Sequence, residues 1–206
     1  FSSLANNNVY IKPENLQKTG SFKIRGAYNK LSKLDEESKN KGIITASAGN
    51  HAQGVAFSAK KLGMKAVICM PEHTPMIKVD GTLKYGAEVV LYGESFDECK
   101  DHALKLAEEN DYTFIPPFDD LDVIEGQGTI GVEILSQLEN ADYVLVPVGG
   151  GGLIAGVSKA VKEINPEIKV IGVEPYSARS MMEAVKKGEV VKLEGVDTCL
   201  LYTSDA

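Results

Sequence analysis

The chain has 206 residues, of which 43% are hydrophobic and 25% are charged, with 22 Lys and Arg against 29 Asp and Glu. This composition is typical of a soluble globular protein and excludes disordered, collagen-like and supercharged chains. A net charge of -7 provides no basic stripe for phosphate groups, so we expect no nucleic-acid partner. No apolar run approaches the roughly 20 residues of a membrane span, and no leader pattern opens the chain. These features predict a cytoplasmic protein without a membrane partner.

Short β-branched runs alternate with amphipathic stretches along most of the chain. The runs predict strands over residues 9–12, 43–47, 66–70, 88–92, 113–115, 143–148 and 169–174. Apolar residues recur at intervals of three and four in the stretches between them, which predicts helices over 50–62, 96–109, 124–138 and 153–164. Alternating strands and helices, with nearly all-apolar strands, favour an α/β fold of doubly wound parallel sheets covered on both faces.

The proline-rich segment Pro-Pro-Phe-Asp-Asp at residues 116–120 interrupts this alternation. We interpret it as a joint between two units. Residues 43–120 then form a small inner α/β domain, and residues 1–42 and 121–198 form a larger one. The last eight residues, 199–206, follow no period and resemble the translation of a sequencing adapter, so we expect a non-native tail.

The cysteines and histidines do not have the spacing of a metal site. Cys69, Cys99 and Cys199 lie far apart in the sequence, and the three histidines are equally scattered. An odd, sparse set of cysteines favours a reducing compartment over a disulfide framework. We therefore expect no protein-bound metal.

The first segment with catalytic potential is Lys-Thr-Gly-Ser-Phe-Lys-Ile-Arg-Gly at residues 18–26. Thr19, Gly20 and Ser21 predict a turn and an N-cap, which places Lys23 in the first turn of a helix. The positive helix end disfavours an ammonium group there and favours the neutral amine, which can attack a carbonyl carbon. Taken alone, a solvated surface lysine is the alternative.

The second segment is Ser-Ala-Gly-Asn-His-Ala-Gln-Gly at residues 47–54, between a predicted strand and a predicted helix. Backbone N–H groups at such a helix start bind carboxylates or phosphates, and Asn50 can donate a hydrogen bond to a ring oxygen. The alternative is a helix cap formed by Ser47 or Asn50 without any ligand.

The third segment contains four consecutive glycines, residues 149–152, between a buried strand and a helix. Such a run indicates a close backbone approach to a ligand, and phosphate is the natural one. However, Gly150, Gly152 and Ala155 also satisfy the dinucleotide pattern GxGxxA, and Glu174 ends the next strand, where an acid would bind ribose. Two hypotheses follow: a nicotinamide-dependent oxidoreductase and a pyridoxal-phosphate enzyme.

These segments, together with Gly-Gln-Gly-Thr-Ile-Gly at residues 126–131, occur in the order and spacing of fold type II pyridoxal-phosphate enzymes. Among these enzymes the chain resembles the threonine/serine dehydratases, and the resemblance extends from about residue 9 to residue 198. Phe-Lys-Ile-Arg at residues 22–25 favours the branch of dehydratases and serine racemases over cysteine synthases and threonine synthases.

The resemblance implies a role for particular residues. Lys23 would hold pyridoxal 5'-phosphate covalently and later move the α-proton of the substrate, while Phe22 packs against one face of the pyridine ring and Asn50 bonds its 3-hydroxyl. The phosphate would be wrapped by Gly149, Gly150, Gly151, Gly152 and Leu153. The substrate carboxylate would be bound by Ser47, Ala48, Gly49, Asn50 and His51, although His51 could instead brace the loop through its ring.

The implied reaction is deamination of L-threonine and L-serine by β-elimination of water, giving 2-oxobutanoate or pyruvate and ammonia. Serine racemase and 3-hydroxyaspartate dehydratase are alternatives within the family, and the oxidoreductase is a distant one. The family also implies a homo-oligomer, and a partner for the pyridine nitrogen on a later strand. We therefore expect the larger domain to be incomplete and the polypeptide as written to bind cofactor weakly, without useful turnover.

Overall fold

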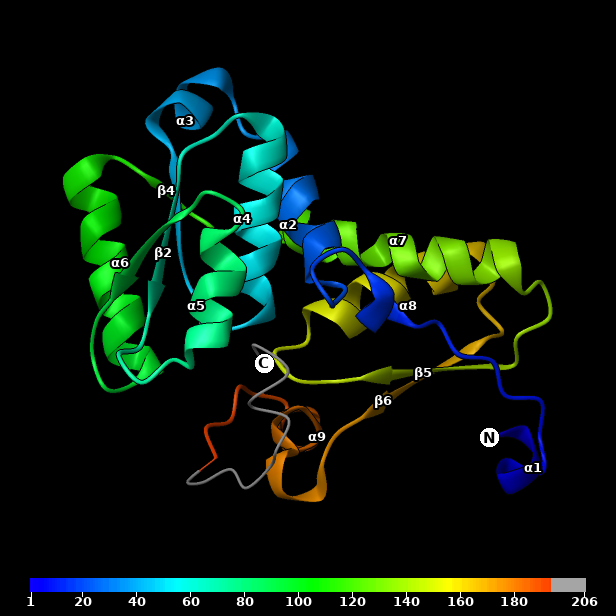
Figure 1. The fold of residues 1–206 in the computed structure, drawn as a ribbon. Helices are drawn as coiled ribbons and strands as arrows, with labels where there is room; N and C mark the ends of the chain where they lie inside the picture. The colour runs from blue at the N-terminus through cyan, green and yellow to red at the C-terminus, as the bar shows by residue number, and fades with distance from the viewer. Residues whose placement is uncertain (194–206) are drawn as a thin grey trace.

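The computed structural model describes residues 1–193, which form two groups of helices and strands (Figure 1). The strands are β1 Ile43–Ala46, β2 Ala66–Met70, β3 Glu88–Leu91, β4 Thr113–Phe114, β5 Tyr143–Pro147 and β6 Lys169–Val173. The helices are α1 Ser2–Ala5, α2 Lys23–Ser32, α3 Glu36–Lys41, α4 Asn50–Leu62, α5 Met76–Leu83, α6 Phe96–Asn110, α7 Leu121–Gln137, α8 Gly152–Ile164 and α9 Ser180–Lys187, with 3-10 turns at η1 Glu14–Leu16 and η2 Tyr176–Ala178.

The first sheet has the strand order β3-β2-β1-β4, and all of its pairs are parallel. Alternate residues of β1 and β2 enter different cores. Ile43 and Ile68 pack with α2, α4 and α5 on one face, whereas Ile44 and Val67 pack with α6 on the other. This arrangement explains why both strands are apolar at every second position and at most positions between, and it confirms the predicted parallel sheet with two covered faces.

The second sheet consists of β5 and β6, paired in parallel with Tyr143 opposite Lys169. Val144 and Val146 are buried in a core shared with α7 and α8, but Tyr143 and Leu145 are exposed on the opposite face. Within residues 1–193, helices α7 and α8 therefore cover one face of this sheet, which belongs to the domain expected to be incomplete. An apolar run cannot distinguish a strand with two covered faces from one with a single covered face.

Two predicted elements differ from the structure by more than one residue at an end. Residues 9–12 form no strand. They run between α1 and η1 with Val9, Tyr10 and Ile11 exposed, because no strand within residues 1–193 pairs with them. Helix α7 begins at Leu121, three residues before the predicted start. Its start is set by Asp120, whose Oδ1 accepts from the N–H groups of residues 122 and 123. The predicted tail at 199–206 lies outside the described residues.

Helices α2, α7 and α8 meet at glycines, and their backbones touch. A Cβ at Gly156 of α8 would lie 2.2 Å from the carbonyl oxygen of Ile124 and 2.6 Å from the nitrogen of Gly128, both on α7. A Cβ at Gly126 would lie 2.6 Å from the Cα of Gly26 on α2. The three helices therefore cross at a distance that no side chain permits, and Figure 1 shows α7 and α8 side by side above β5 and β6.

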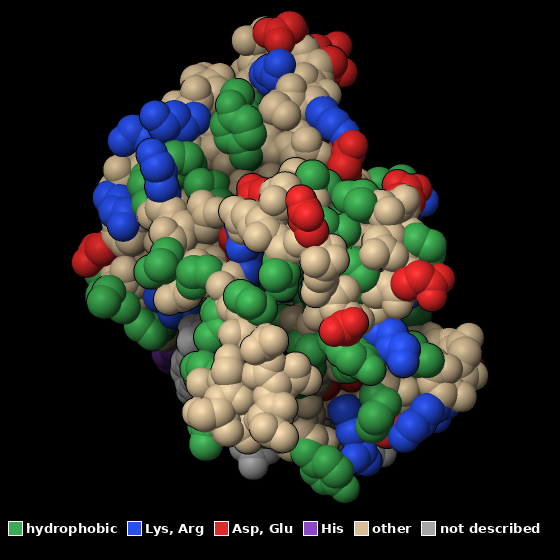
Figure 2. Space-filling view, turned by 90° about the vertical axis from the view of Figure 1, so that its right-hand side faces the viewer, with side chains coloured by type: hydrophobic (Ala, Val, Ile, Leu, Met, Phe, Trp, Pro, Cys, Tyr) green, Lys and Arg blue, Asp and Glu red, His purple; other side chains and the backbone are tan. Residues whose placement is uncertain are grey.

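The surface carries both signs of charge. Figure 2 shows Lys and Arg side chains and Asp and Glu side chains distributed among hydrophobic ones on the face that it presents. Exposed apolar residues on the described surface include Leu4, Ile11 and Leu145. Among residues 1–193, no helix combines the length and the apolar composition needed to cross a membrane.

Because the helices cross so closely, we expect one added methyl group to lower the stability of the fold considerably. We expect Gly156→Ala to lower the free energy of unfolding by about 2 kcal/mol or more, because the new Cβ overlaps main-chain atoms of α7 that cannot rotate away. Urea denaturation measures this loss.

The matched control is Gly81→Ala on α5. Its Cβ would meet only the flexible side chain of Gln53, at 3.3 Å, and alanine favours the helix by up to about 1 kcal/mol. Equal stability of the two alanine variants would contradict the close crossing of α7 and α8.

Candidate functional site

Lys23 is buried at the start of α2, with 5% of its surface exposed. Its Nζ donates a hydrogen bond to the carbonyl oxygen of Pro117 at 3.0 Å. The same nitrogen lies 5.6 Å from the ring centroid of Phe22 and 5.9 Å from that of Phe118. The alternative of a solvated surface lysine is therefore wrong.

The helix start at Lys23 differs in detail from the predicted cap. Phe22 takes the N-cap position, without a capping side-chain bond, although the Ser21 hydroxyl accepts a 3.4 Å hydrogen bond from the N–H of Lys23. Gly20 adopts a φ of +76°, so the predicted turn is present. Lys23 thus occupies the first helical turn as expected, at the positive end of the helix.

The second segment lies directly beside Lys23. Helix α4 begins at Asn50, and the Ser47 hydroxyl accepts from the N–H groups of Gly49 and Ala52, both at 3.2 Å. A Cβ at Gly54 would lie 3.2 Å from the carbonyl carbon of Lys23, so α4 packs against the first turn of α2. Ser47 therefore performs the capping role that the sequence left open as an alternative, in the loop proposed to bind a carboxylate.

His51 is fully buried on α4. Its Nε2 lies 3.1 Å from the carbonyl oxygen of Ile115, which also accepts a 2.7 Å hydrogen bond from the Thr45 hydroxyl. The ring therefore bridges the start of α4 to the segment that follows β4. This contact supports the bracing role for His51, and a direct contact with substrate stays a prediction.

The tetraglycine loop connects β5 to α8. Gly151 is the N-cap of α8 with a φ of +87°, a conformation that L side chains rarely adopt. A Cβ at Gly150 would lie 2.4 Å from the ring of Phe118, and one at Gly152 would lie 2.7 Å from its carbonyl oxygen. The loop therefore presents bare backbone at the start of a 13-residue helix, where N–H groups lack intrahelical acceptors and bind anions.

Phe118 joins these segments, and the sequence analysis missed it. Its ring centroid lies 5.9 Å from Nζ of Lys23, and its ring also packs against Gly150. The sequence does contain a signal for this position, because the aromatic residue follows two prolines at the end of a predicted strand. The prolines alone, however, indicate only a domain boundary. Lys23, the loop at 47–54 and the tetraglycine loop thus come together in space.

The carboxylate of Glu174, which a dinucleotide site would need for the ribose, is already engaged in the structure. The two carboxylate oxygens of Glu174 accept from the N–H groups of Met181 and Met182, at 2.9 and 2.8 Å. The acid therefore caps the start of α9 in place of standing open to a ribose. Within the described chain, His, Cys, Asp and Glu side chains form no cluster of three that could hold a metal ion.

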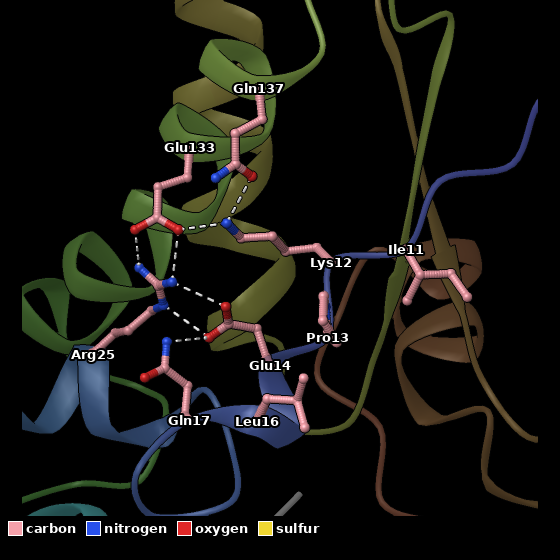
Figure 3. Close-up of a pocket in the computed structure, with 9 residues that line it drawn as sticks. All are labelled: Ile11, Lys12, Pro13, Glu14, Leu16, Gln17, Arg25, Glu133 and Gln137. Atoms are coloured by element: carbon pink, nitrogen blue, oxygen red, sulfur yellow. Dashed lines mark hydrogen bonds and ion pairs between the residues drawn. The ribbon is translucent and has the colours of Figure 1, made fainter.

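A surface pocket of about 500 Å³ lies apart from the predicted residues (Figure 3). At its centre, Arg25 forms ion pairs with Glu133 at 2.7 Å and with Glu14 at 2.8 Å. Lys12 also pairs with Glu133, at 2.6 Å. Hydrogen bonds from Arg25 and then Lys12 lower the pKa of Glu133 to about 2. These charges neutralise one another, so we assign the pocket a structural role in holding the N-terminal segment to α2 and α7.

Comparison with known proteins shows one family. The chain matches the family described as pyridoxal-phosphate dependent enzymes over residues 1–201. It is 56% identical over 191 residues to the chloroplastic biosynthetic threonine dehydratase 2 of Solanum lycopersicum, covering 93% of this chain and 32% of that protein. It is 50% identical over 198 residues to the L-threonine ammonia-lyase of Thermotoga maritima, covering 96% and 49%. The chain thus spans a third to a half of these relatives.

Solved structures show the same similarity. The processed form of threonine deaminase isoform 2 from Solanum lycopersicum superposes with a TM-score of 0.94 and 54% identity, covering 96% of this chain and 57% of that one. Maize serine racemase superposes with a TM-score of 0.93 and 36% identity, covering 95% and 60%. Both likenesses extend over nearly all of this chain, including the three segments that meet at Phe118.

The low pKa of Glu133 predicts a pH-dependent contribution to stability. A carboxylate with a folded pKa of about 2, against an ordinary value of 4.5, stabilises the fold above pH 4.5, and this contribution is lost as the pH falls towards 2. Because 40% of the side chain is exposed, we expect Glu133→Gln to cost no more than about 1 kcal/mol at pH 7. Urea denaturation at several pH values should show this difference shrinking between pH 4.5 and 2.

The control is Glu163→Gln, which removes the exposed ion pair with Lys159 on α8. Solvent screens such a pair, so its removal should change stability little at any pH. A wild-type advantage over Glu133→Gln that persists unchanged at the lowest pH would contradict the assigned ion-pair role.

Proposed function

The chain belongs to the pyridoxal-phosphate dependent enzyme family, and from this premise we propose that the protein deaminates L-threonine and L-serine by eliminating water. The products would be 2-oxobutanoate or pyruvate, and ammonia. The observation that carries the proposal is the Lys23 amine, buried at the start of α2 and close to the ring of Phe118, which also packs against the tetraglycine loop. Relatives named threonine dehydratase and L-threonine ammonia-lyase support the reaction.

The residues around Lys23 fit pyridoxal 5'-phosphate. Lys23 would hold the cofactor through Nζ, with Phe22 against the pyridine ring and Asn50 at its 3-hydroxyl. The phosphate would lie on the bare backbone at the start of α8, formed by Gly149, Gly150, Gly151, Gly152 and Leu153. When bound, the cofactor supplies an electron sink that makes the α-proton of an amino acid acidic.

Lys23 would act as the base that takes this proton. Its position at the positive end of α2 and its burial both disfavour the ammonium form, so Nζ is suited to accept a proton. The carbonyl oxygen of Pro117 accepts from the same nitrogen and fixes its direction. A base held in this way needs little reorganisation before it reacts.

The loop at the start of α4 would bind the substrate carboxylate. The loop would use Ser47, Ala48, Gly49, Asn50 and His51. It leads into the turn of α4 that contains Gly54, whose backbone packs against that of Lys23. The N–H groups and the positive end of a 13-residue helix favour an anion at this place. Holding the carboxylate there would turn the α-hydrogen towards Nζ.

We also propose that two domains contribute different parts of the site. Residues 43–120, with the four-stranded sheet, would supply the carboxylate loop, and residues 1–42 and 121–198 would supply Lys23 and the phosphate loop. The reaction needs only a small amino acid and the cofactor. We propose a cytoplasmic homo-oligomer, without a nucleic-acid or membrane partner.

Serine racemisation is the second candidate function. Maize serine racemase and the Dictyostelium discoideum enzyme, which has a TM-score of 0.88 and 40% identity, favour it. A racemase must return a proton to the opposite face of the α-carbon, whereas a dehydratase must release the β-hydroxyl. The two are separated by their products: D-serine in one case, and pyruvate with ammonia in the other.

We expect Lys23→Ala to abolish the visible absorption of the bound cofactor and to lower ammonia release by at least about a hundredfold, because no other residue would replace the amine. The measurement uses the protein expressed with the coding sequence that adjoins this chain in its gene. Absorption spectra after incubation with pyridoxal phosphate, and ammonia release from threonine and serine, provide the two readouts.

Lys159→Ala is the matched control, because Lys159 lies on the exposed part of α8 and pairs only with Glu163 among the described contacts. It should retain both readouts. An unchanged spectrum in Lys23→Ala would contradict the assignment of Lys23, and D-serine as the dominant product of the wild type would replace deamination with racemisation.

A further inference from the structure

Phe118 has no role in the binding scheme above, yet it lies inside the site. It belongs to the segment that connects β4 to α7, which the sequence marks only by its prolines. Its ring centroid is 5.9 Å from Nζ of Lys23, and both its ring and its carbonyl group press against the tetraglycine loop. The side chain is therefore close to the amine and in contact with the tetraglycine loop.

The segment before Phe118 is fixed by its carbonyl groups. The carbonyl oxygen of Ile115 accepts from Thr45 and lies 3.1 Å from Nε2 of His51, and that of Pro117 accepts from Lys23. Pro116 and Pro117 have no N–H group and restricted φ angles, so they cannot continue the sheet. The backbone entering Phe118 is thus rigid and is tied to β1, α4 and α2.

The segment after Phe118 is fixed as firmly. Asp120 caps α7 through Oδ1, and its Oδ2 forms an ion pair with Lys30 at 2.8 Å. Lys30 lies on α2, the helix that begins at Lys23. The ring of Phe118 is therefore held from both ends relative to the helix that carries the amine.

We propose that Phe118 is a positioning residue for Lys23: its ring blocks the space beside the tetraglycine loop and so keeps Nζ directed at the reacting carbon. The inference rests on the proposed function, because it concerns the same amine. A smaller side chain would leave room for Nζ to rotate away. The loss should therefore appear in the reaction of the amine, and much less in the binding of the phosphate.

The experiment measures the reaction of the Lys23 amine separately from the binding of the phosphate. The protein is incubated with pyridoxal phosphate, borohydride reduces any carbon–nitrogen double bond to a stable amine, and mass spectrometry locates the modified lysine. We expect Phe118→Leu to slow modification of Lys23 at saturating pyridoxal phosphate by about tenfold. The affinity for pyridoxine 5'-phosphate, which lacks the aldehyde, should stay within about twofold, because the backbone of the loop binds its phosphate.

Two further variants sharpen the result. Lys30→Met removes the ion pairs of α2 with Asp120 and Asp122 but leaves the ring and the cap of α7 in place, and we expect it to slow the modification of Lys23 in the same direction. Phe57→Leu is the control. Phe57 is a half-buried aromatic residue of α4 that packs against Tyr85, with 5.4 Å between the ring centroids. Its replacement should leave the rate of Lys23 modification unchanged. Thermal unfolding of each variant checks that it is folded.

The outcomes are distinct. Wild-type protein that is not modified preferentially at Lys23 overturns the proposed function and this inference with it. Wild-type modification at Lys23 with an unchanged rate in Phe118→Leu overturns the inference alone. A loss of pyridoxine 5'-phosphate affinity equal to the loss of rate also overturns it, since Phe118 would then only support the loop. If Phe118→Leu is not folded, the rate in Lys30→Met decides.

Discussion

The relative positions of Lys23 and the tetraglycine loop depend on the crossing of α2, α7 and α8. At Gly26 and Gly126, and at Gly128 and Gly156, the main chains of neighbouring helices touch without a side chain between them. Such a crossing fixes helix positions more closely than side-chain packing does, because main-chain atoms cannot change rotamer. Since α2 begins at Lys23 and α8 begins at the tetraglycine loop, the same contacts fix the amine and the anion-binding backbone relative to each other.

For the binding of an anion at this site, the local electrostatic field is more important than the net charge of the chain. A protein with a net charge of -7 would repel a phosphate at long range, but salt screens that repulsion within about 10 Å. In the proposed site, the starts of α4 and α8 would direct N–H groups and positive helix ends towards the carboxylate and the phosphate. Lys23 itself stands at a third such helix start, that of α2.

Periodicity predicted the parts of the fold that depend on one stretch of sequence. The bounds of β2 and α4 agree with the structure because both are continuously buried or strongly amphipathic. Residues 9–12 were misassigned because a β-branched run needs a neighbouring strand, which local sequence does not reveal. The motifs predicted that Lys23 and the glycine loop matter, but no local pattern could show that Phe118 lies close to both, since that contact joins residues about thirty positions and more apart.

The proline-rich joint shows why a domain boundary can also be part of a site. In a parallel sheet, ligands bind at the carboxyl ends of the strands. A chain that leaves such a sheet after its last strand starts from this same edge. β4 ends at Phe114, and within four residues the chain contributes one carbonyl to His51 and Thr45, another to Lys23, and the ring of Phe118. Prolines suit this route because they end the ladder without leaving an unpaired N–H group in the interior. The two prolines that resemble a linker in the sequence therefore also allow the segment to line the site.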